Sequence, residues 1–72
     1  MDNEKHERFL RVAENRTKKA INFIRLLGNC ANTNNYTYTE GEIDKIFSAL
    51  DVELKRTKAL FKKNDAILFK LR

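Results

Sequence analysis

The chain has 72 residues and a formal net charge of +5, with 35% of its residues charged and 42% hydrophobic. This length accommodates one domain, residues 1–72, and a core of this size usually needs a disulfide, a metal or self-association for stability. Cys30 is the only cysteine and His6 the only histidine, which excludes an intrachain disulfide and falls short of a structural zinc site. We therefore expect a homodimer with no metal and no cofactor.

The beginning of the chain, residues 1–6, is charged instead of apolar. No apolar run along the chain approaches the roughly 20 residues of a membrane span. A lone thiol also agrees with a reducing compartment. These features predict a cytoplasmic protein that does not associate with a membrane.

A first apolar seam predicts a helix over about residues 3–27. Its members are spaced by three and four residues in alternation, which is typical of a helix packed along a partner: Leu10, Ala13, Thr17, Ala20, Ile24 and Leu27. The chain has no proline to interrupt this helix. Gly28 follows the seam and predicts a left-handed stop.

Residues 29–38 are uncharged and rich in types that favour turns, which predicts a connecting loop. Thr39 and Glu42 then have the spacing of a capping box, so the second helix should begin here. Tyr36 and Tyr38 lie just before this start. They either cap the open end of the core or offer a partner amphipathic anchors, a role that suits tyrosine.

A second seam predicts a helix over about residues 40–63. Its members repeat the same alternation of spacings: Ile43, Phe47, Leu50, Leu54, Thr57 and Phe61. Asn64 and Asp65 predict a break, and residues 66–72 form a short apolar tail beyond it. The predicted fold is therefore all-α, an antiparallel two-helix hairpin with a C-terminal tail.

Folding the two helices antiparallel predicts a definite packing register. Small Ala20 faces large Leu54, while Thr17 faces Thr57 near the middle of the hairpin. Small side chains opposite large ones fill the interior at near-constant helix spacing, as native packing density requires.

One flank of this hairpin is predicted to be apolar with a central pair of opposite charges. The three pairs along this interaction flank are Phe9 with Leu60, Arg16 with Glu53, and Phe23 with Ile46. An apolar surface of this kind must be buried against another layer. Either a second hairpin completes a four-helix bundle, or the tail residues 67–71 lie across the flank as an extended segment.

Three basic residues recur every seven positions and form one outward stripe: Arg11, Lys18 and Arg25. Such a basic stripe is typical of proteins that contact nucleic-acid phosphates. The alternative explanation is structural, because both helices have acids near their start and bases near their end, as the helix dipole favours. Nucleic acid is therefore a possible partner that the charge pattern does not establish.

No nucleophile, base and orienting group with a recognisable spacing can be assembled from the chain. We therefore expect no enzymatic activity and no small-molecule substrate. Two function classes remain open. The first is a protein-interaction or regulatory module that binds itself and an unidentified protein, and the second is a basic helical bundle that binds nucleic acid.

Segments 24–29, 35–40 and 43–50, together with the closing residues 69–71, resemble a family of short uncharacterised helical-hairpin proteins of Gram-positive bacteria, often encoded near mobile genetic elements. This resemblance implies a cytosolic accessory protein and carries over no catalytic residue. The expected architecture is also similar to that of the plasmid-encoded Rop proteins, helical hairpins that dimerise into four-helix bundles and bind RNA. That second similarity is one of fold alone.

Overall fold

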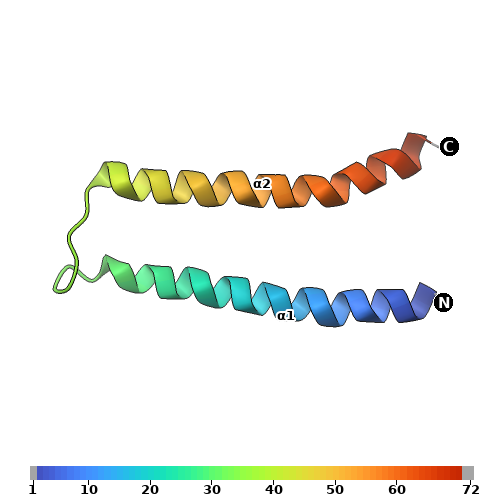
Figure 1. Ribbon diagram of the computed structural model, residues 1–72, viewed down its shortest axis with the longest axis horizontal. Helices are drawn as coiled ribbons and strands as arrows, with labels where there is room; N and C mark the ends of the chain where they lie inside the picture. Colours follow the sequence, from blue (N-terminus) through green and yellow to red (C-terminus); the bar gives the residue numbers. More distant parts are fainter. Residues whose placement is uncertain (1, 71–72) are drawn as a thin grey trace. The chain divides into compact units, whose positions relative to one another are not determined.

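The computed structural model describes the backbone of residues 2–70 and the side chains of residues 3–62. Within these limits it contains helix α1 (Asp2–Gly28), a short 3-10 turn η1 (Asn29–Ala31) and helix α2 (Glu40–Lys70), and no strand (Figure 1). The predicted all-α fold, with two helices joined by a loop, is confirmed. The chain divides into two compact units, Met1–Thr37 and Tyr38–Arg72. The register between the two helices stays a prediction.

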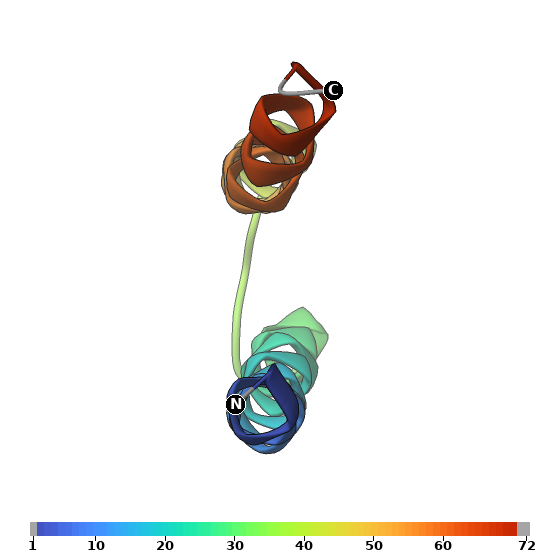
Figure 2. The same cartoon turned by 90° about the vertical axis from the view of Figure 1, so that its right-hand side faces the viewer.

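Helix α1 is continuous for 27 residues. Its blue-to-green ribbon winds without a break along its length in Figure 1, and Figure 2 shows the same helix end-on. The absence of proline from the chain lets the backbone hydrogen bonds run uninterrupted. An ion pair one turn apart, between Lys18 Nζ and Glu14 Oε1 at 3.2 Å, adds a few tenths of a kcal/mol.

The predicted left-handed stop at Gly28 is wrong. Gly28 has φ −59° and ψ −26°, which is right-handed helical geometry, and no glycine of the described chain has a positive φ. The helical path instead tightens into η1 and ends at Asn32, whose ψ of 104° is extended. Glycine adopts the right-handed and left-handed conformations about equally readily, so its position after the seam did not by itself fix the geometry.

Replacing Gly28 with alanine should therefore stabilise the protein. A Cβ at this position meets no atom within 4 Å, and alanine in helical geometry is favoured over glycine by about 0.5–1 kcal/mol. Urea denaturation followed by circular dichroism, at a fixed protein concentration, measures the change. A loss of stability of similar size would indicate that Gly28 adopts the left-handed conformation, where alanine is strained.

Asn32 organises the loop through local hydrogen bonds. Its side-chain Oδ1 accepts the backbone N–H of Asn34 at 3.0 Å, and its carbonyl oxygen accepts those of Asn35 at 3.1 Å and Tyr36 at 3.0 Å. Asparagine favours turns because its short amide side chain hydrogen-bonds the backbone two residues further on. The asparagine at position 32 therefore has a structural role in forming the turn.

Helix α2 begins with the predicted capping box, which is confirmed. The backbone N–H of Thr39 donates to Glu42 Oε1 at 2.8 Å, and the backbone N–H of Glu42 donates to Thr39 Oγ1 at 3.1 Å. These reciprocal bonds satisfy donors that the first turn of a helix otherwise leaves unpaired. A capping residue of this kind contributes about 1 kcal/mol.

The predicted break at Asn64 and Asp65 is wrong, because α2 continues to Lys70. Asparagine and aspartate cost only about 0.7 kcal/mol or less each in a helix interior, whereas glycine and proline cost more. Neither glycine nor proline occurs in this region. The helical backbone also contradicts an extended tail over residues 67–70. The side chains of residues 63–72 lie outside the described part of the chain.

Candidate interaction surface

Large apolar side chains are exposed on both helices. Among the side chains of residues 3–62 none is buried, and five are half-buried: Val12, Ala13, Leu27, Ile43 and Leu50. Phe23 is 69% exposed and Leu54 is 62% exposed. Soluble proteins rarely leave contiguous apolar surface of this kind uncovered, and where they do it often marks an interaction site.

On α1 the apolar residues occupy one face, about half of the helix circumference at 3.6 residues per turn. Phe9, Arg16 and Phe23 follow one another at intervals of seven residues, so they form a nearly straight line along this face. We call these three residues the α1 line. Arg16 lies well inside this face, whereas Lys19 lies at its edge, in line with Leu26 seven residues further on. At the start of the line, the rings of His6 and Phe9 stack with centroids 6.4 Å apart.

On α2 the apolar face is somewhat narrower and has the same internal pattern. Ile46, Glu53 and Leu60 recur every seven residues, and we call them the α2 line. Glu53 is the only charged residue on the apolar face between residues 43 and 61. Each helix therefore presents one line with a charge at its centre, and the two central charges have opposite signs.

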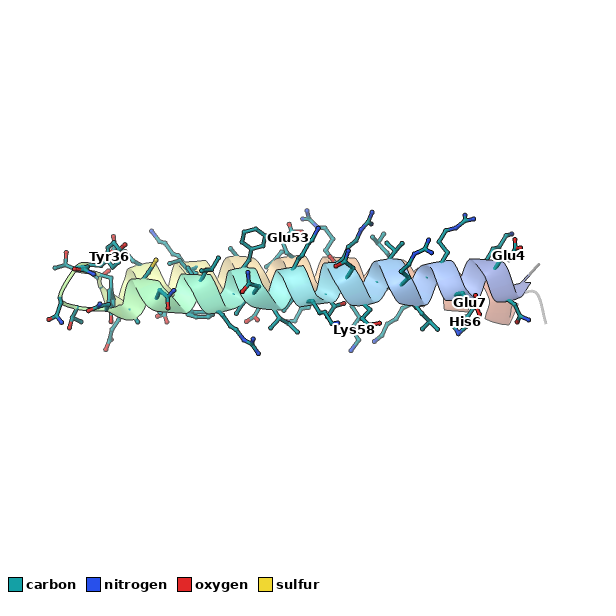
Figure 3. All side chains as sticks on the ribbon, turned by 90° about the horizontal axis from the view of Figure 1, so that it is seen from below. Glu4, His6, Glu7, Tyr36, Glu53 and Lys58 are labelled. Carbon is teal, nitrogen blue, oxygen red and sulfur yellow. The ribbon has the colours of Figure 1, made fainter. Side chains whose placement is uncertain are left out.

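Glu53 has a loose partner within its own helix. Its Oε1 lies 3.4 Å from Arg56 Nη1, and both side chains are well exposed. Exposed pairs of this geometry contribute only about 0.3–0.5 kcal/mol, so Glu53 can exchange this partner for another cation at little cost. Figure 3 shows that Glu53 and Lys58 leave α2 on different sides. The predicted pairing of Arg16 with Glu53 stays a prediction.

The two loop tyrosines differ in their surroundings. Tyr38 lines a shallow, open hollow with Glu40, Ile43 and Asp44 at the first turn of α2. With Thr39 as the capping residue, Tyr38 and Ile43 have the spacing of a hydrophobic staple, which fixes the direction in which the chain enters a helix. Sequence reasoning missed this role, although the position of Tyr38 next to the capping box signalled it.

Tyr36 instead belongs to the turn built by Asn32. Its backbone N–H donates to the carbonyl of Asn32 at 3.0 Å, while its side chain is 52% exposed (Figure 3). An exposed phenol ring on a backbone held by hydrogen bonds loses little conformational entropy on binding. Of the two loop candidates, Tyr36 is thus the better placed to contact a partner.

The predicted basic stripe lies along a single helix, as expected from its spacing. Arg11, Lys18 and Arg25 are all exposed on α1, on the side away from the α1 line. Lys18, at the centre of the stripe, is paired with Glu14. This ion pair offsets part of the positive charge and weakens the stripe as a phosphate-binding surface.

No described part of the chain supplies a metal centre, since residues 3–62 contain no group of three or more potential acidic, histidine or cysteine ligands. Cys30 is a free, exposed thiol in η1. Neither α1 nor the described part of α2 combines the length and the apolar character needed to cross a membrane. The chain matches no family model, no curated protein and no solved structure.

Proposed function

We propose that this chain is a non-enzymatic protein-interaction module that self-associates through the apolar faces of α1 and α2. In this proposal two hairpins bury their apolar faces together as a four-helix bundle, and the dimer then acts on a further protein partner. A regulatory or accessory role in the cytoplasm of bacteria or their mobile elements agrees with the sequence resemblance to short Gram-positive proteins.

The exposure of the apolar faces is the observation that supports this proposal. Full burial of a side chain such as Phe23 or Leu60 contributes about 1.5–3 kcal/mol, and these side chains are mostly exposed in the isolated chain. The face of α1 is also wider than the narrow seam that contacts a single neighbouring helix. A helix in a four-helix bundle has two neighbours and uses a face of this width.

Light scattering coupled to size-exclusion chromatography tests the proposal. At micromolar concentration we expect a mass of twice the 8.5 kDa of one chain. A mass of one chain at all concentrations up to hundreds of micromolar would overturn the proposal of self-association.

The second candidate function is nucleic-acid binding. It is favoured by the exposure of the three basic side chains along one helix, opposite the apolar face. A dimer would present two such stripes, and affinity for a phosphate backbone rises with the number of cations that contact it. The ion pair of Lys18 with Glu14 places this candidate second.

Reversing all three charges of the stripe should weaken binding and reduce its salt dependence if this candidate is correct. Each phosphate contact contributes about 0.9 to the slope of the logarithm of affinity against the logarithm of salt concentration, so three lost contacts reduce that slope by about 3. Fluorescence anisotropy with labelled duplex DNA and hairpin RNA, from low to physiological salt, measures it.

A matched control reverses the same number of charges on α2: Lys45, Lys55 and Lys62. We expect this variant to retain most of the binding, because it alters the net charge equally but leaves the stripe intact. No binding by the unaltered protein at low salt would exclude the second candidate. Equal losses in both variants would show that net charge, and not the stripe, attracts the nucleic acid.

A further inference from the structure

We propose that the occupant of the apolar faces is a second copy of the chain in one particular arrangement, with α1 of each copy beside α2 of the other and both loops at the same end. This inference rests on the proposed self-association. It is carried by the opposite charges at the centres of the α1 line and the α2 line.

A two-fold axis can bring together two hairpins with aligned helices in two ways. In the first, α1 lies against α1 of the second copy, so Arg16 faces Arg16 and Glu53 faces Glu53. In the second, α1 lies against α2 of the second copy, and each Arg16 faces a Glu53. Like charges at the centre of an apolar interface oppose association, whereas opposite charges favour it and fix the register.

The apolar members of the lines agree with the second arrangement. When Arg16 is level with Glu53 and the helices are antiparallel, the residues seven positions away also meet: Phe9 with Leu60 and Phe23 with Ile46. Each contact then joins one aromatic and one aliphatic side chain, at both ends of the charged pair. In the first arrangement, the α1 line of one copy faces the α1 line of the other. Phe9 then meets Phe23 of the second copy, and the two Arg16 side chains face each other.

The described partner of Glu53 does not compete strongly with this arrangement. Glu53 and Arg56 are exposed and only 3.4 Å apart at closest approach, a geometry that holds neither side chain firmly. Arg16 has no ion-pair partner among the side chains of residues 3–62. In the proposed dimer each of these charges then lies between two opposite charges, one from its own chain, as the predicted register has it, and one from the second copy.

The two arrangements differ in the direction of the second hairpin. In the predicted hairpin α1 and α2 are antiparallel. Contact of α1 with α2 of the second copy then requires a two-fold axis parallel to the helices, so the loops lie together. Contact of α1 with α1 requires a perpendicular axis and places the loops at opposite ends. Cys30 lies just beyond α1, is exposed and is the only cysteine, so it reports on this difference.

Spin labels on Cys30, measured by double electron–electron resonance, distinguish the two arrangements. We expect a distance below about 30 Å, because neighbouring helices in a bundle are about 10 Å apart. Loops at opposite ends would give about 40 Å or more, the length of 27 residues at a rise of about 1.5 Å per residue. That longer distance would overturn this inference while leaving self-association intact, whereas a monomer would overturn both.

Charge exchange provides the second test. Arg16→Glu alone should raise the dimer dissociation constant by at least about tenfold, since it sets like charges across the interface, and the double variant R16E/E53R should restore it. Arg11→Glu, an equal charge change on the opposite side of α1, is the control and should have little effect. Circular dichroism of each variant shows whether its helices remain formed.

Two outcomes would contradict the charge argument. One is a dimer that Arg16→Glu leaves unaffected. The other is a double variant R16E/E53R whose dimer dissociation constant is as high as that of Arg16→Glu, although its helical content is unchanged. A mixture of Arg16→Glu with Glu53→Arg should form heterodimers more readily than either variant forms homodimers, because only the mixture restores both opposite-charge contacts between copies.

Discussion

Phe23→Glu should convert the proposed dimer into single chains. In a two-fold interface each substitution is present twice, so the loss of two buried phenylalanine side chains removes about 3–6 kcal/mol. The dissociation constant should therefore rise at least about 100-fold. Light scattering over a concentration series measures the change in mass, and analytical ultracentrifugation supplies the dissociation constants.

The control for this variant is Val52→Glu. Val52 is 54% exposed and lies on the side of α2 away from its apolar face, so it undergoes the same kind of substitution outside the proposed interface. We expect Val52→Glu to remain a dimer. If both variants dissociate equally, the apolar face of α1 is not the interface, and the loss of the dimer reflects a general effect of added negative charge.

Leu54→Ala should cost about 2–5 kcal/mol of stability if Leu54 enters the predicted core opposite Ala20. Alanine is at least as good a helix former as leucine, so the cost would come from lost packing alone. If Leu54 stays exposed in solution, the substitution should change the stability by no more than about 0.5 kcal/mol. Urea denaturation at a fixed protein concentration separates these outcomes.

Exchanging the two residues tests the register directly. The double variant A20L/L54A keeps the total volume of the predicted layer, and volume-conserving exchanges in a core are tolerated best. We expect it to recover at least half of the stability lost in Leu54→Ala. If Ala20→Leu gives no recovery, Ala20 and Leu54 do not share a layer, and the predicted packing register is incorrect.

The parts of the fold that depend on local signals could be predicted from the sequence. The start of α2 follows from Thr39 and Glu42, because a capping box is completed by residues three positions apart. The continuity of α1 follows from its apolar periodicity. The two lines along the helices also follow from sequence, since spacing by seven residues places side chains in line on any uninterrupted helix.

Two predictions failed where a residue type permits more than one conformation. Gly28 was expected to be left-handed, but the helix ends only at Asn32, whose side chain and carbonyl both accept backbone hydrogen bonds. Asn64 and Asp65 were expected to end α2, but their helix propensities are only mildly unfavourable. In both cases the decisive quantity was a small energy difference that residue type alone does not specify.

The candidate surface was predictable only in part. Periodicity identified the α1 line and the α2 line, and the position before the capping box could have identified Tyr38 as a helix-entry residue. The identity of a further protein partner depends on complementarity with a molecule whose shape is not encoded in this chain. For the same reason, the charge stripe of Arg11, Lys18 and Arg25 does not by itself identify a ligand.

The hydrogen bonds on both sides of the loop determine where α1 ends and where α2 begins. Asn32 closes the end of the α1 segment, and Thr39 with Glu42 opens α2, each through contacts only two to four residues long. The number of residues between the helices is thus set by local contacts. Each helix end is therefore defined by contacts inside its own unit, and a substitution at Asn32 or Thr39 should alter one helix end without requiring a change in the other helix.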